Sequence, residues 1–254
     1  MDRLTVTLPT IQSELALTMI KAAQQQGARQ QRRIRVVLVL LNYGEISTEE
    51  LLGDGTQGVD ALLMAFMPHF GQPVAETLFG IVNPGGKLPY TVYPNNYTDL
   101  VDFLDMSMSA GPGRGYRYYR GKPLFPFGFG LSYTTFDLVL VRQKLGGTAQ
   151  PNRFDVRVTN TGKVAGTETV QNYFVPPPVP PGWTAPIPLK RLLSFRKLHL
   201  QPHQSSEVSF SVSCRQMMLV DNEGVHQQLS GNFTLLFTNG NSQTVSTTMT
   251  CPKI

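Results

Sequence analysis

The sequence predicts two parts of different fold class, an α/β part with a parallel sheet and, after it, an all-β part that folds as a sandwich. In the N-terminal third, helical periodicity alternates with two almost continuous apolar runs. From Phe136 onward, apolar residues recur at every second position instead. Between the two parts lies a segment so rich in glycine and proline that it can hold few helices or long strands.

The helices of the α/β part are predicted from spacing and from their end signals. Apolar residues at four-residue spacing follow Pro9–Thr10 and predict a long first helix: Ile11, Leu15, Met19 and Ala23. A short helix is expected over Thr48–Leu52. A third begins at Gly71–Gln72–Pro73, with proline early in its first turn, and ends before Gly80.

Two strands are predicted over residues 34–41 and 59–66, which are nearly all apolar, as is typical of strands buried on both faces of a parallel sheet. The alternation of strand and helix implies right-handed crossovers. Such strands need neighbouring strands and a helix layer on each face. We therefore expect an incomplete α/β sandwich.

The C-terminal part is predicted to be an immunoglobulin-like β-sandwich of several short strands, a fold of about 100 residues. Two-residue alternation is clearest in the following segments: 154–158, 208–212, 233–237 and 245–249. The proline run 176–181 is interpreted as a long loop between strands. The alternative is that this run is a ligand for SH3-like domains. The expected domains are residues 1–95, a loop-rich connector at 96–135, and the sandwich at 136–254.

Composition excludes several classes of protein. With 41% hydrophobic and 15% charged residues, the chain is not a charge-rich disordered protein. No apolar run reaches the ~18 residues of a transmembrane helix, and the N-terminus lacks the layout of a signal peptide. The two cysteines, Cys214 and Cys251, are too few for a disulfide framework and can either form one bridge or stay as thiols.

Five stretches in order resemble the C-terminal half of glycoside hydrolase family 3, in particular its β-xylosidase and α-arabinofuranosidase branch. They begin with Asp2–Arg3, Leu8–Pro9, Gln12 and Leu15, and continue with Phe79–Gly80 and Asn83 to Pro89. The other three are Gly113 to Tyr119, Pro126 to Thr134, and Val158 to Gly162 with Gly166, Glu168, Val170 and Gln171. The last stretch is similar to the family's fibronectin-III-like domain, so the resemblance implies a fibronectin-III-like β-sandwich.

The resemblance implies hydrolysis of β-xylosides or arabinofuranosides with retention, which needs two carboxyl groups about 5–5.5 Å apart. In the family, the nucleophile is an aspartate of an N-terminal (β/α)8-type barrel, and the acid/base glutamate precedes the Asp–Arg pair. Asp2–Arg3 directly follows Met1, so both carboxylates are expected to lie outside this chain. Glu45, Glu49, Glu50, Asp54 and Glu76 are not expected to replace them. We expect the chain alone to be inactive and to act on oligosaccharide or polysaccharide only with the missing barrel domain. The resemblance implies a secreted protein, whereas the chain itself carries no signal peptide, so the sequence leaves the compartment open.

Four residues are candidates for contact with the sugar. His69 and Gln72 lie in a loop after the second apolar strand, at the edge where open α/β sheets place ligands. A tight strand-to-helix turn is the favoured alternative for this loop. Arg114 and Tyr116 can line an entrance, since tyrosine stacks on sugars and arginine bonds hydroxyls, while domain packing is the favoured alternative.

Other functions are less well supported. Arginines interleaved with tyrosines at 114–120 suggest nucleic-acid binding, but that segment matches the hydrolase pattern, and no nucleic-acid partner is expected. The histidines His199, His203 and His226 have no carboxylates at ligand spacing, so neither a metal nor another cofactor is expected. The alternative to a hydrolase fragment is a non-catalytic remnant that acts as a fibronectin-III-like interaction or carbohydrate-binding module.

Overall fold

A computed structural model describes residues 4–53, 58–68, 71–146 and 151–252 of the chain. They divide into two compact units. The α/β unit comprises Met1–Phe79, Thr91–Met106 and Gly121–Phe125, and the β-sandwich unit comprises Gly80–Tyr90, Ser107–Arg120 and Pro126–Ile254. The segment between the predicted domains is therefore divided between the two units.

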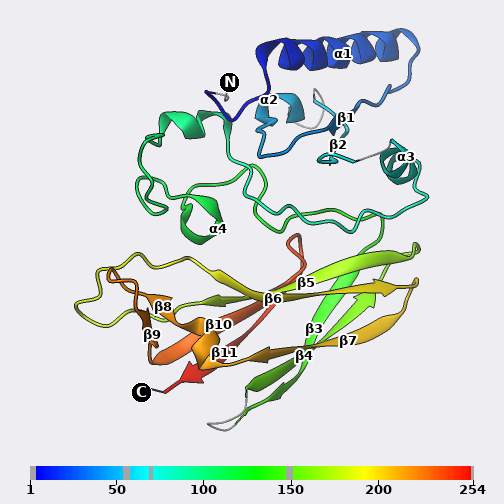
Figure 1. The fold of residues 1–254 in the computed structure, drawn as a ribbon. Coiled ribbons are helices and arrows are strands. Elements are labelled where there is room, and N and C mark those ends of the chain that lie inside the picture. The colour runs from blue at the N-terminus through cyan, green and yellow to red at the C-terminus, as the bar shows by residue number, and fades with distance from the viewer. Residues whose placement is uncertain (1–3, 54–57, 69–70, 147–150, 253–254) are drawn as a thin grey trace. The chain divides into compact units, whose positions relative to one another are not determined.

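The α/β unit follows the predicted order of helices and strands (Figure 1). Its elements are α1 (Thr10–Arg29), β1 (Val37–Leu40), α2 (Glu49–Leu52), β2 (Ala61–Met64), α3 (Gln72–Leu78) and the 3-10 helix η1 (Asn95–Asp99). The strands β1 and β2 pair in parallel, from Val37 opposite Ala61 to Leu40 opposite Met64. Both strands are shorter than the apolar runs that predicted them, because each run continues into loop at its ends.

The core of the α/β unit is small. Leu8, Ile20, Leu40 and Leu51 form its buried apolar cluster, and they join α1 and α2 to the sheet. The expectation that both strands are buried on both faces is wrong for this chain: Leu40 is the one buried residue of β1 and β2, and Val37 is 44% exposed. The physical reason is that a described sheet of two strands offers few neighbours to cover either face.

The apolar row that predicted α1 lies on the outer face of the helix. Ile11, Leu15 and Met19 are 73%, 63% and 57% exposed. The buried positions of α1 are instead Ser13, Ile20 and Gly27. Spacing thus predicted the helix correctly, and it does not predict which face is covered.

The β-sandwich unit has two antiparallel sheets, in the orders β11-β10-β5-β6 and β3-β4-β7, and a small β8-β9 ribbon (Figure 1). The fold class predicted from the sequence is confirmed. Its elements are α4 (Gly115–Tyr118), β3 (Phe136–Lys144), β4 (Asn152–Asn160), β5 (Gly166–Val175), β6 (Arg191–Leu200), β7 (Ser205–Val212), η2 (Cys214–Met217), β8 (Leu219–Val220), β9 (His226–Gln227), β10 (Gly231–Thr238) and β11 (Thr244–Cys251).

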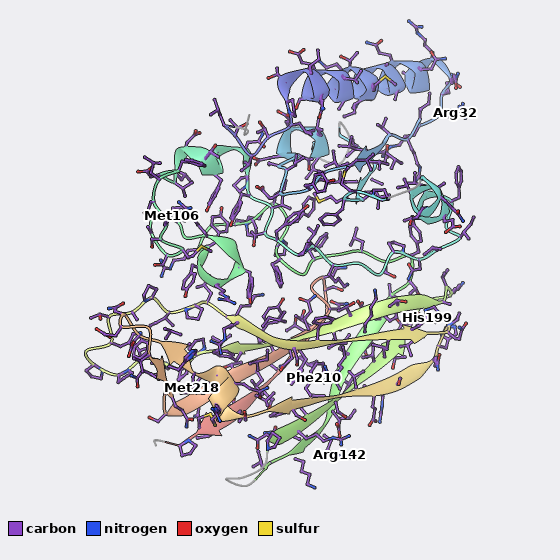
Figure 2. The ribbon with its side chains drawn as sticks, viewed as in Figure 1. Arg32, Met106, Arg142, His199, Phe210 and Met218 are labelled. Atoms are coloured by element: carbon purple, nitrogen blue, oxygen red, sulfur yellow. A yellow bond between two sulfur atoms is a disulfide. The ribbon has the colours of Figure 1, made fainter. Side chains whose placement is uncertain are left out.

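The inward residues of the two sheets form one large core. The alternating residues that predicted β4, Phe154, Val156 and Val158, are all fully buried, and Phe210 of β7 lies among them (Figure 2). The ring centroids of Phe154 and Phe210 lie 5.8 and 5.2 Å from that of Phe237.

Two sequence features find their place at the edge of this core. Cys214 and Cys251 form a disulfide, which joins the start of η2 to the end of β11 and decides between the two alternatives left open by the sequence. The proline run 176–181 lies between β5 and β6, as the loop interpretation requires.

Candidate functional site

In the α/β unit, the carboxyl ends of β1 and β2 bring two loops side by side. The Ala65 amide donates to the Leu40 carbonyl at 2.9 Å, and the Asn42 amide donates to the Phe66 carbonyl at 3.1 Å. Phe66 has a φ of 55°, a left-handed conformation that is uncommon for a bulky residue and marks a sharp change of direction after β2. This is the edge at which open α/β sheets hold ligands.

The predicted residues at this edge are Gln72 and His69. Gln72 is exposed at the start of α3, and its Nε2 donates to Glu76 Oε1 at 2.6 Å, one helical turn away. His69 lies outside the described residues. A role of either side chain in sugar binding stays a prediction.

The carboxylates of the α/β unit hold its backbone in place. Glu45 Oε1 accepts from the Tyr93 amide at 3.0 Å, and Glu49 Oε2 accepts from the Asn95 amide at 2.8 Å. Asp60 pairs with Arg33 at 2.7 Å and accepts from the Val36 amide at 2.8 Å. These geometries fit a structural role, since each carboxylate satisfies a backbone amide of a neighbouring segment.

In the β-sandwich unit, Tyr116 lies in a group of aromatic rings. Its ring stacks on Phe127 with centroids 4.4 Å apart and meets Tyr173 edge-on at 5.9 Å. Its hydroxyl accepts from the Leu192 amide at 3.2 Å. Arg114 is half-buried at the start of α4, and its amide donates to the Met108 carbonyl at 2.8 Å. These contacts favour the packing alternative for both residues, while a sugar contact stays a prediction.

Burial shifts the pKa values of three residues near the aromatic rings around Tyr116. The Lys190 Nζ lies 4.6 Å from the centroid of the Tyr173 ring, and burial lowers the pKa of Lys190. Burial, together with the nearby Tyr116, raises the pKa of Tyr173 well above its ordinary value. Burial and then the charge of Arg117 lower the pKa of Arg191. Tyr173 therefore stays neutral at physiological pH and acts in packing.

The glycine-rich motifs at 83–89 and 126–134 pack tightly on strand β5. Gln171 Nε2 donates to the Gly128 carbonyl at 2.9 Å, and a Cβ at Gly128 would lie 2.1 Å from Gln171 Oε1. Lys87 pairs with the buried Glu168 at 2.8 Å, and a Cβ at Gly85 would lie 2.7 Å from the Thr167 carbonyl oxygen. Both motifs thus pack on the sandwich and belong to the same unit.

Cavities open to solvent occur among the described residues of both units. One, of about 450 Å³, lies between α1 and the amino ends of the strands and is lined by Arg32, Arg33 and Asp60, among others. The second, of about 480 Å³, surrounds Trp183, and the third, of about 410 Å³, is lined by Glu168 and Asn239. Gln72, Arg114 and Tyr116 line none of the three.

The described residues contain no group of three or more His, Cys, Asp or Glu side chains that could hold a metal ion. Nor, among them, is any helix both long and apolar enough to cross a membrane.

Comparison with known proteins identifies the family. Residues 1–133, more than half of the chain, match the model described as the glycosyl hydrolase family 3 C-terminal domain. The chain belongs to glycosyl hydrolase family 3. Residues 168–249 match the fibronectin type III-like domain. The motifs that pack on β5 are thus part of a family 3 scaffold, which agrees with the resemblance seen in the sequence.

The relatives of this family 3 chain include β-xylosidases. It is 33% identical to beta-D-xylosidase 1 of Arabidopsis thaliana, over 88% of the chain and 32% of the relative. It is 34% identical to a xylan 1,4-beta-xylosidase of Xylanibacter ruminicola, over 87% of the chain and 23% of the relative. The crystal structure of a Bifidobacterium adolescentis family 3 beta-glucosidase is also similar. The match covers 98% of this chain and 36% of the beta-glucosidase chain, with a TM-score of 0.78 and 27% identity. The chain therefore spans a third or less of the length of these curated relatives and corresponds to their C-terminal part.

Sequence reasoning assigned no catalytic role to Glu45 and Glu49, but it missed the backbone segment that they hold and the cavity at Trp183. The bonds from Glu45 and Glu49 reach residues 93–95, more than 40 positions away, so local pattern carries no signal for them. The cavity had one available signal: Trp183, the single tryptophan of the chain, lies one glycine after the proline run.

Proposed function

We propose that this chain is the C-terminal portion of a retaining, β-xylosidase-like glycoside hydrolase and that it does not cleave glycosides by itself. Retaining hydrolysis uses two carboxyl groups about 5–5.5 Å apart, one as nucleophile and one as acid/base. The observation that carries the proposal is the use of Glu45, Glu49 and Asp60 as acceptors of backbone hydrogen bonds. Bonds of this kind orient each carboxylate toward a backbone amide of the chain, which supports a structural role for it.

In the proposed enzyme, the part of the chain described above supplies scaffold. The α/β unit presents the loops at the carboxyl ends of β1 and β2, from which Gln72 and His69 would reach the sugar. The motif segments at 83–89 and 126–134 are anchored on the sandwich by Lys87 and Gln171. The nucleophile and the acid/base would come from a barrel domain and from the segment that joins it to this chain.

The proposal is tested by assay of the chain with aryl β-xyloside, aryl α-arabinofuranoside and aryl β-glucoside. We expect no release of the aryl group above the rate in buffer from any of them. Turnover that one Asp or Glu substitution abolishes would contradict the proposal. The Glu45→Gln and Glu49→Gln variants should be less stable than the unmodified chain and equally inactive.

A second candidate function is a non-catalytic binding module. It is favoured by the large core of the β-sandwich unit, compared with the small core of the α/β unit. The mass of the protein isolated from its source separates the two. A mass that exceeds that of 254 residues by a barrel of roughly 250 residues would support the hydrolase portion. A mass equal to that of this chain would favour the binding module.

A further inference from the structure

The cavity around Trp183 lies within the β-sandwich unit at the end of the proline run, and Gln72, Arg114 and Tyr116 do not line it. Two segments form it: the loop that follows the proline run between β5 and β6, and the residues around the β8-β9 ribbon. Its volume of about 480 Å³ lies within the range of about 300–1,000 Å³ typical of small-molecule sites. The cavity therefore has room for a ligand of the size of a mono- or disaccharide.

Trp183 supplies one wall and is held in a fixed position. The indole is partly buried and packs against the sandwich core, and its Nε1 donates to the Ala185 carbonyl at 2.8 Å. The hydrogen-bonding end of the ring is thus satisfied inside the protein. What the ring offers to the cavity is apolar aromatic surface, which suits the C–H face of a sugar ring.

Three side-chain amides lie beside Trp183 and are also held in place. Asn222 Nδ2 donates to Thr184 Oγ1 at 2.8 Å, and Gln227 Nε2 donates to Asp221 Oδ2 at 2.8 Å. Gln228 Nε2 donates to the Pro252 carbonyl at 3.1 Å. Each of these bonds uses one amide hydrogen, so the second hydrogen and the amide oxygen can serve a ligand. Neutral groups that both donate and accept suit hydroxyls.

The charge of the lining selects against other ligands. Asp221 and Glu223 are its charged residues, and no lysine or arginine lines it, so phosphates and uronates would be repelled. Asp221 Oδ1 accepts from the Val225 and Glu223 amides, at 2.8 and 3.1 Å. The bond from Gln227, followed by that from the Val225 amide, holds the pKa of Asp221 below its ordinary value. The carboxylate is thus ionised and already saturated with donors, which makes it a poor ligand for a cation.

We propose that this cavity is a binding site for a neutral saccharide, with Trp183 as the stacking wall and Asn222, Gln227 and Gln228 as the hydroxyl-binding groups. The site is built from the β-sandwich unit alone. It would hold a sugar chain whether or not the protein also cleaves one, so its test is independent of glycoside hydrolysis.

The test uses the fluorescence of the whole 254-residue chain, because Trp183 is its single tryptophan and reports on this site alone. Xylotetraose and cellotetraose are titrated separately, with tetragalacturonate as the anionic comparison. We expect a saturable change in emission in the millimolar range with at least one neutral tetrasaccharide, and at least tenfold weaker binding of tetragalacturonate. The absence of a saturable change with both neutral sugars, or equal binding of the anionic one, would overturn the proposal.

The variant Asn222→Ala tests the assignment without disturbing the core, because Asn222 is exposed. Loss of one hydrogen bond should weaken binding about fivefold. The matched control is Asn241→Ala, which removes an exposed asparagine from the third cavity of the same unit and should leave affinity unchanged. A loss of affinity in Asn241→Ala with none in Asn222→Ala would place the sugar elsewhere and refute the assignment.

Discussion

At the scale of single residues, Asp155 in the middle of β4 is a buried carboxylate whose partners bear on stability. It is 1% exposed, yet it accepts from Arg153 Nε at 2.8 Å and from Ser209 Oγ at 2.6 Å, with Arg142 at 3.6 Å. Burial opposes ionisation of the carboxyl group. The hydrogen bonds and the arginine charges outweigh burial and hold the pKa of Asp155 below its ordinary value of 3.8.

Because the pKa of Asp155 is lower in the folded than in the unfolded chain, this carboxylate stabilises the fold above pH 3.8, and the contribution is lost as pH falls through the folded value. Asp155→Asn should lower the free energy of unfolding at neutral pH by about 2 kcal/mol. It should also flatten the dependence of that free energy on pH in acid. Urea unfolding between about pH 3 and 7 measures both effects.

The control is Glu207→Gln, which removes an exposed ion pair with Arg157 between the neighbouring strands β4 and β7. Pairs of this kind contribute about 1 kcal/mol or less. An Asp155→Asn variant with the same acid slope as the unmodified chain would show that this carboxylate does not control the acid response.

At the scale of elements, the motifs at 83–89 and 126–134 are held on β5 by a few buried contacts. The clearest is the Lys87–Glu168 pair, whose side chains are 10% and 3% exposed. Asn239 Nδ2 also donates to Glu168 Oε2 at 3.2 Å, and Lys87 Nζ to the Gly130 carbonyl at 3.2 Å. One ion pair thus ties the motif at 83–89, the motif at 126–134 and the sandwich together.

Lys87→Met should lower the free energy of unfolding by about 3–5 kcal/mol, because it leaves the Glu168 carboxylate buried without its cation. The double variant Lys87→Met with Glu168→Leu should recover part of the loss, since neither charge then remains buried. Lys163→Met serves as the control, because Lys163 is exposed. Thermal and urea unfolding measure the series, and equal effects in Lys87→Met and Lys163→Met would exclude a structural role for the pair.

At the scale of the whole molecule, the two units differ greatly in the core that each possesses. The β-sandwich unit buries rings and aliphatic side chains from both sheets, while the apolar cluster of the α/β unit has four buried residues and its described sheet has two strands. The exposed row on α1, Ile11, Leu15 and Met19, belongs to the weaker unit. An isolated chain is therefore expected to be much less stable in its N-terminal third.

Amide hydrogen exchange should show this difference directly. We expect the amides of Val37–Leu40 to exchange close to the rate of an unfolded chain, and those of Phe154–Val158 to be protected by the full stability of the sandwich. The two strands provide the matched comparison within one sample. Strong protection of Val37–Leu40 in the monomer would contradict a weak α/β unit.

Local pattern by itself determined the order of the elements, because periodicity and end signals act over a few residues. The alternation at Phe154–Val158 correctly predicted a sandwich strand, and the apolar spacing after Pro9 correctly predicted a long helix. Five motifs in order, among them the one at 126–134, together suggested the family. Strands β5 and β6 were less evident, because β5 carries buried polar residues such as Glu168 and Gln171 among its apolar ones.

Tertiary structure alone decided the features that depend on distant residues meeting. It paired Cys214 with Cys251, turned the apolar row of α1 outward, and engaged Glu45 and Glu49 with a segment more than 40 positions later. It also assembled the Trp183 cavity from two loops. The physical reason is that spacing specifies the direction of a side chain relative to its own helix or strand, whereas the neighbour that it meets depends on how the chain returns to it.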